Sequence, residues 1–99
     1  MLIPLSHVLC HRVASPSCSQ QDIDIARFFF NTDEATQRAM EDVYVRWRVA
    51  TDKRYGELEN KRMSLSEDDF MMLFHKSMCD SANAFTLAMQ QVIDSRAKQ

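Results

Sequence analysis

Glycine and proline are scarce in this chain, and their scarcity constrains the fold more than any other feature of the sequence. Only one glycine and two prolines occur among 99 residues. The turns between strands and the loops that cradle phosphates depend on these two residue types. The composition therefore argues against an all-β fold and against a glycine-rich phosphate loop, and it predicts an all-α protein.

Two long stretches place apolar residues at helical spacing. The steps of three and four between residues 33 and 62 predict one helix, in which Gly56 is expected to mark a kink or a close backbone contact. A second helix is predicted over residues 67–95, with Ser66 as its N-terminal cap. Because the turn between them is short, the two helices are predicted to form a long antiparallel hairpin, each helix roughly 40 Å long.

A short leading helix is predicted over residues 20–30, before the hairpin. Ser19 and Asp22 match the pattern of an N-terminal capping box. The helix ends in the apolar triplet Phe28-Phe29-Phe30, which must dock either on the rest of the chain or on a partner.

The first 18 residues differ from the rest in composition, because serine, histidine and cysteine are frequent and helical periodicity is absent. We expect a flexible N-terminal arm over residues 1–18, in which a short ordered piece at Leu2–Leu9 stays open, and a single helical domain over residues 19–99. The arm has no basic residue before its apolar patches, which argues against a Sec signal peptide. No apolar run reaches the length of a membrane span. The expected location is the cytoplasm, or export without a cleaved Sec signal peptide.

The charge balance argues against a nucleic-acid partner. Twelve basic and fourteen acidic residues leave a formal charge of −2, whereas nucleic-acid-binding proteins usually concentrate basic residues on one face. A local basic face around Arg46, Arg48, Lys53 and Arg54 leaves a nucleic-acid-binding helical protein open as an alternative.

Histidine and cysteine residues raise a second alternative, a small metal- or thiol-dependent protein. His75 and Cys79 are four residues apart, on one face of the third helix. The group between His7 and Cys18 matches no regular zinc spacing, and the third residue that a Cys–His nucleophile needs is not visible. Three cysteines are an odd number that favours free thiols, while a Cys10–Cys18 bridge stays open. We predict no cofactor, no metal site and no enzymatic activity.

The hairpin is expected to keep apolar surface for other helices, because two amphipathic helices bury only one seam each. The predicted function is that of a non-enzymatic interaction protein that self-associates, or packs in a coiled-coil manner on helices of a protein partner. The predicted partner-binding residues are large apolar side chains on all three helices: Phe29, Phe30, Trp47, Phe70, Phe74, Met78 and Phe85.

The layout resembles the small helical subunits of bacterial type III secretion systems, and inner-rod proteins in particular. The resemblance rests on the Ser-rich segment His7–Gln21, the acidic turn Ser64–Asp69 and the run Phe70–Phe74 that leads into the C-terminal helix. It implies a protein that is exported through its own machine and polymerises helically, or a chaperone or adaptor of the same system. The chain departs from the family at His75 and Lys76, where a glutamine is usual.

Overall fold

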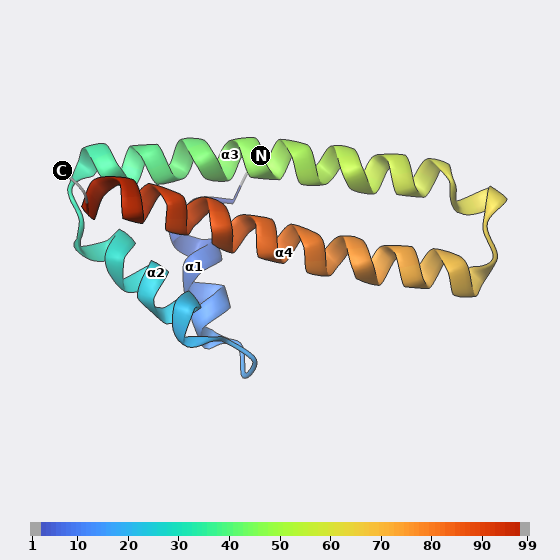
Figure 1. Cartoon of the computed structure of the whole chain (residues 1–99), viewed down its shortest axis with the longest axis horizontal. Coiled ribbons are helices and arrows are strands. Elements are labelled where there is room, and N and C mark those ends of the chain that lie inside the picture. The colour runs from blue at the N-terminus through green and yellow to red at the C-terminus, as the bar shows by residue number, and fades with distance from the viewer. Residues whose placement is uncertain (1–2, 98–99) are drawn as a thin grey trace.

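A computed structural model of the chain, which describes residues 3–97, is built from helices. The helices are α1 (Leu5–Ala14), α2 (Gln20–Asn31), α3 (Glu34–Asn60) and α4 (Glu67–Ala97), with a 3-10 turn, η1 (Arg62–Ser64), before α4. No strand occurs within residues 3–97, and α3 and α4 lie side by side and antiparallel (Figure 1). The all-α fold and the long antiparallel hairpin are therefore confirmed.

Local capping explains where the three predicted helices begin. Ser19 and Asp22 form a reciprocal capping box at the start of α2. The Asp33 carboxylate accepts a 2.8 Å hydrogen bond from the Thr36 N–H at the start of α3, and the Ser66 hydroxyl accepts one of 3.1 Å from the Asp69 N–H in α4. Because these caps satisfy N–H groups that a helix leaves free, the helix ends lie within two residues of the predicted ones.

The N-terminal segment is the main departure from the expected architecture. Instead of a flexible arm, residues Leu5–Ala14 form α1, so the prediction is wrong for that stretch. Leu5 and Leu9 are one turn apart, and both are fully buried against the other helices. The burial of these two leucines favours the packing of α1 on the other helices, although the composition of the segment is mostly polar. Residues 1 and 2 of the expected arm, and residues 98 and 99 of the expected domain, lie outside the described residues.

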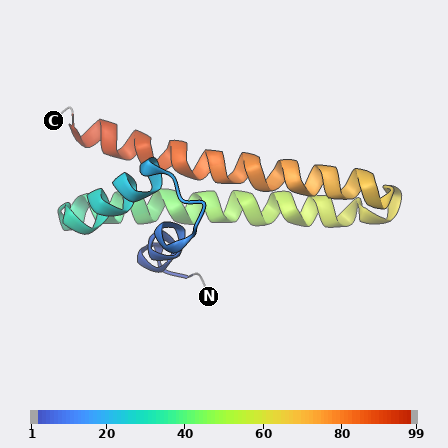
Figure 2. The ribbon, with the colours of Figure 1, turned by 90° about the horizontal axis from the view of Figure 1, so that it is seen from below.

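The core lies at one end of the hairpin. Figures 1 and 2 show α1 and α2 together on one side of the hairpin, at the end where α3 begins and α4 finishes. We call this part, made of α1 and α2 with residues 34–50 and 81–97, the covered end. The buried cluster consists of Leu5, Leu9, Ile25, Ala26, Phe29, Met40, Tyr44, Phe85 and Met89.

The rest of the hairpin, residues 51–80, has no further helix packed on it, and we call it the bare end (Figure 1). It accounts for the elongated dimensions of 49 × 26 × 26 Å. Gly56 lies here, within α3. Figure 1 shows α3 as one continuous helix. A Cβ atom built at Gly56 meets nothing within 4 Å. The expected kink or close backbone contact at this glycine is therefore wrong.

Candidate protein-binding groove

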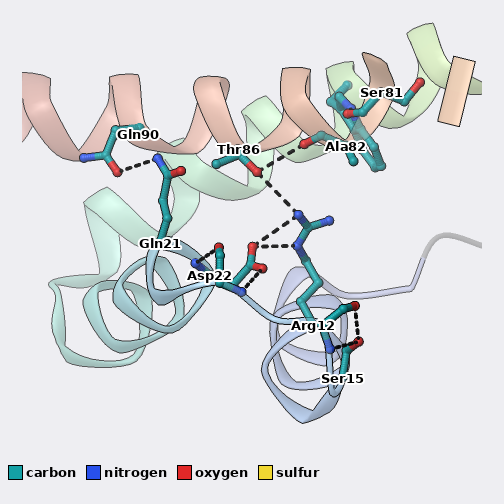
Figure 3. Close-up of polar contacts among 11 residues, drawn as sticks. Arg12, Ser15, Gln21, Asp22, Ser81, Ala82, Thr86 and Gln90 are labelled. Carbon is teal, nitrogen blue, oxygen red and sulfur yellow. Dashed lines mark hydrogen bonds and ion pairs between the residues drawn. The ribbon is translucent and has the colours of Figure 1, made fainter. Parts of the chain in front are cut away.

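Polar contacts of Arg12 connect α1 with both α2 and α4 at the covered end (Figure 3). The Arg12 guanidinium of α1 lies 3.2 Å from the Asp22 carboxylate of α2 and donates a 3.4 Å hydrogen bond to the Thr86 hydroxyl of α4. The same guanidinium lies over the ring of Phe85, 4.5 Å from its centroid. Gln21 and Gln90 add a 3.4 Å hydrogen bond between α2 and α4. One side chain, Arg12, thus connects three helices.

The charge of Asp22 depends on this arrangement. Burial by itself raises the pKa of the Asp22 carboxyl. The hydrogen bond from the Ser19 N–H and the positive charge of Arg12 outweigh burial, and they hold the pKa below its ordinary value of 3.8. The ion pair therefore stays intact at neutral pH and weakens only in acid.

An aromatic cluster closes the covered end toward the middle of the hairpin. Trp47 lies 5.1 Å from Phe85 and 6.1 Å from Tyr44, measured between ring centroids. Its indole N–H donates a 2.8 Å hydrogen bond to the backbone carbonyl of Ser81. Next to this cluster, the buried residues between α3 and α4 are small and polar, namely Thr51 and Ser81. The middle of the hairpin therefore separates two differently packed ends.

The bare end contains an apolar groove between α3 and α4. It has a volume of about 410 Å³. The ring of Phe74 lies 5.6 Å from Tyr55 and 6.1 Å from Phe70. Phe70 is buried, Phe74 is half-buried and Met78 is 47% exposed, so the groove is open to solvent. We define the groove by its lining residues: Tyr55, Leu58, Glu59, Phe70, Phe74 and Met78.

A second hollow adjoins the groove at the tip of the hairpin. It has a volume of about 370 Å³ and shares Phe70 with the groove. The Arg62 guanidinium lies over the Phe70 ring at 4.7 Å and pairs with Glu59 at 3.4 Å. Met71, which is 55% exposed, lines its far side. The two hollows make one continuous apolar strip along the bare end.

The groove lies on the same side of the hairpin that α1 and α2 cover at the other end. On α4, Met78 is one turn before Ala82, and Ala82 lines the hollow against Arg12 and Asp22. On α3, Tyr55 follows the buried Tyr44 by about three full turns, so both face the same way. The groove is therefore the uncovered continuation of a face that is elsewhere packed.

The seven residues predicted to bind a partner fall into three places. Phe70, Phe74 and Met78 are brought together in the groove. Phe29 and Phe85 are buried in the core, and Trp47 packs against that core. All three side chains therefore stabilise the fold. Phe30 is 49% exposed on α2, where its ring packs edge-on against Phe29.

Sequence reasoning missed two groups of residues. Tyr55 and Leu58 line the groove, but they are absent from the set of residues predicted to bind a partner. Sequence reasoning also missed α1, for which the signal was Pro4 followed by Leu5 and Leu9 at helical spacing.

The four basic residues proposed as a local face on α3 share one only in part. Arg46, Lys53 and Arg54 lie within about 100° of one another around the helix, whereas Arg48 is about 200° around the axis from Arg46. Arg48 is also paired with Asp52 at 3.4 Å. This geometry does not support a nucleic-acid interface on α3.

His75 and Cys79 lie close enough to share a metal ion, but the part of the chain that the structure describes offers them no third ligand of the types that bind zinc. His75 Nε2 and Cys79 Sγ are 3.7 Å apart, close to the roughly 3.6 Å that two ligands of a tetrahedral zinc ion span. Both side chains are exposed. Within residues 3–97, no three His, Cys, Asp or Glu side chains lie close enough together to hold a metal ion, so this pair has no third ligand of these types. All three cysteines are free, so the Cys10–Cys18 bridge is not formed.

None of the helices between residues 3 and 97 combines the length and apolar character that crossing a bilayer requires. In comparisons with known proteins, no family model, curated protein or solved structure matches the chain.

Proposed function

We propose that the protein is a non-enzymatic interaction protein that packs helices from another chain into the groove of its bare end. One observation carries the proposal. The same face of the hairpin is covered by α1 and α2 at one end and left open at the other, where Phe70, Phe74 and Met78 line a groove. An exposed apolar strip of this kind is typical of a protein interaction site.

A helix is the occupant that fits the groove best. The groove runs along the seam between the antiparallel helices α3 and α4. At the covered end, α2 packs on the same two helices (Figures 1 and 2). Amphipathic helices bind such surfaces through apolar side chains at steps of three and four. Met71 and Met78 border the strip, and methionine adapts to partners of varied shape because it is flexible and polarisable.

The groove offers little for catalysis. Its single carboxylate, Glu59, is already paired with Arg62. Its other lining residues are apolar or aromatic, so no nucleophile stands beside a base. A subunit or chaperone of a secretion apparatus would use such a groove in the proposed way, and the proposal does not depend on that setting.

The test is oxidation of methionines by dilute hydrogen peroxide, read by mass spectrometry. It compares the purified protein at high dilution with the protein in extract of the cells that make it. Met78 and Met71 border the groove and its adjoining hollow, Met72 is exposed outside them, and Met40 is a buried control. We expect Met78 and Met71 to be protected in the extract while Met72 is oxidised at an unchanged rate. Equal oxidation of Met78 and Met71 in both samples would contradict the proposed function.

A further inference from the structure

We infer that α4 carries a binding site for a soft metal ion, Cu(I), formed by His75, Met78 and Cys79. The site lies on the bare part of the helix. Of its three residues, only Met78 also lines the groove, so the inference does not depend on what occupies the groove. It rests on a distance between two side chains, on the order of residues along α4 and on the types of ligand.

Sulfur atoms surround His75 on the surface of α4. On a helix, the nearest neighbours of a residue are those three and four positions away in either direction. Each of these four neighbours of His75 carries a sulfur atom: Met71, Met72, Met78 and Cys79. All five side chains are exposed. Imidazole, thiolate and thioether groups are ligands for copper, so the cluster has the chemistry of a copper site.

Two of the ligands have the spacing that one shared ion needs. The His75 Nε2 atom lies 3.7 Å from the Cys79 Sγ atom. Bonds from a metal ion to nitrogen and sulfur are about 2.0–2.3 Å long, so an ion beside this pair reaches both atoms without a change in the helix. Cys79 is a free thiol, and it releases its proton to solvent when the ion binds.

Met78 is the third ligand that the geometry of the helix favours. Side chains on an α-helix lean toward its N-terminus, so Met78 and Cys79 both lean toward the turn that contains His75. By the same rule, Met71 and Met72 lean away from it. Met78 is 47% exposed, and its flexible side chain brings the thioether to the ion by rotation about its own bonds.

The ligand types favour Cu(I) over zinc. Zinc sites in proteins use thiolate, imidazole and carboxylate ligands, and no third residue of those types joins the pair within residues 3–97. Asp80 follows Cys79 in sequence but lies about 100° around the helix axis from it. Thioether sulfur is a soft ligand that favours Cu(I). The third position is therefore open to a copper ligand and not to a zinc ligand.

The site lies away from the core of the protein. The buried cluster belongs to the covered end, whereas His75 and Cys79 are exposed on the bare end (Figure 1). The ion can therefore enter from solvent without any movement of the core. For the same reason, substitutions at the three ligands leave the core side chains in place, so each variant is expected to fold.

The test titrates the purified, reduced protein with Cu(I) under anaerobic conditions, in competition with bicinchoninate, a coloured Cu(I) chelator. We expect one tight site per chain. Residues behind a metal ligand already change metal affinity 10–100-fold, so loss of a ligand in Cys79→Ser or His75→Gln should weaken binding at least about tenfold. Met78→Leu preserves the size of an apolar side chain at the groove and should also weaken binding.

Two controls separate this site from other sulfur atoms of the chain. Met72→Leu is the matched control for Met78→Leu, since Met72 is also a neighbour of His75 but leans away from it, and it should leave the affinity unchanged. Cys10 and Cys18 are the other free thiols. The double variant Cys10→Ser, Cys18→Ser should keep the tight site. X-ray absorption at the copper edge should show one nitrogen and two sulfur ligands.

Binding that Cys79→Ser and His75→Gln leave unchanged would overturn the inference, and so would loss of the tight site in the Cys10→Ser, Cys18→Ser variant. Equal weakening by Met72→Leu and Met78→Leu would contradict the choice of Met78 as the third ligand. Zinc that stays bound in the presence of an equal concentration of Cu(I) would contradict the choice of metal. Circular dichroism of each variant confirms that a loss of affinity is not a loss of folding.

Discussion

The two ends of the hairpin are built from the same two helices and differ in what lies on them. At the covered end, Phe85 is 0% exposed beneath Arg12 and the aromatic cluster. At the bare end, Phe74 occupies a comparable place on α4 and is only half-buried. Apolar spacing therefore defines a face of a helix, whereas a second layer decides whether that face becomes core or surface.

The largest difference between the ends is expected in the cost of truncating an aromatic side chain. Phe85→Ala should lower the free energy of unfolding by about 3–5 kcal/mol, because it opens a cavity in a closed core. Phe74→Ala should lower it by about 1–2 kcal/mol in the monomer, since Phe74 already contacts solvent. Urea unfolding followed by circular dichroism measures both. Equal losses would show that the two ends are packed alike.

A smaller but still large effect is expected when α1 is weakened. Leu9→Ala should cost about 2–4 kcal/mol, because Leu9 is 1% exposed and joins α1 to the core. Val13→Ala serves as a control, since Val13 lies at the edge of the same cluster and is only partly buried. If Leu9→Ala left stability unchanged, α1 would not be part of the second layer.

The sequence predicted the helices of the hairpin well because their signals are local. The caps at Ser19, Asp33 and Ser66 and the apolar steps between them need no knowledge of distant residues. The sequence predicted α1 poorly, because Leu5 and Leu9 are two apolar residues among serine, histidine and cysteine. Their burial depends on helices that are far away in the chain.

The same reasoning explains which binding residues could be predicted. On α4, Phe70, Phe74, Met78 and Phe85 were all predicted to bind a partner. The first three line the groove, whereas Phe85 is buried in the core. Periodicity places all four on the apolar side of α4 and cannot distinguish them. The distinction arises from where α1 and α2 pack, which is a tertiary contact.

The polar connection at the covered end should make part of the stability depend on pH. Asp22→Asn should cost about 1–2 kcal/mol at neutral pH, because it removes the charge that Arg12 contacts. The pKa of Asp22 is lowered on folding, so its contribution is complete above its ordinary value of 3.8 and is lost as the pH falls below that value.

Unfolding experiments between about pH 6 and pH 3 provide the check on this contribution. The wild type should lose more stability in acid than Asp22→Asn does. The pKa of Asp33 is also lowered, by its hydrogen bonds with Thr36, and it contributes equally in both proteins. Parallel pH profiles of the two proteins would show that Asp22 is not coupled to folding.

The smallest effect is expected at the bare end and has the opposite sign. Gly56→Ala should raise the free energy of unfolding by about 1 kcal/mol, because alanine favours the helix and its Cβ meets nothing within 4 Å. Thermal unfolding at low protein concentration measures it. A loss of stability would show that the bare end of α3 is more closely packed than its open groove indicates.

Hydrogen exchange of the dilute monomer, followed by mass spectrometry, tests the central difference between the two ends most directly. Amides of residues 51–80 are predicted to exchange faster than those of residues 36–50 and 81–93, although all lie mainly in the same two helices, because only the second group has a second layer packed on it. Uniform protection along α3 and α4 would contradict the account, since the bare end would then be complete without an occupant.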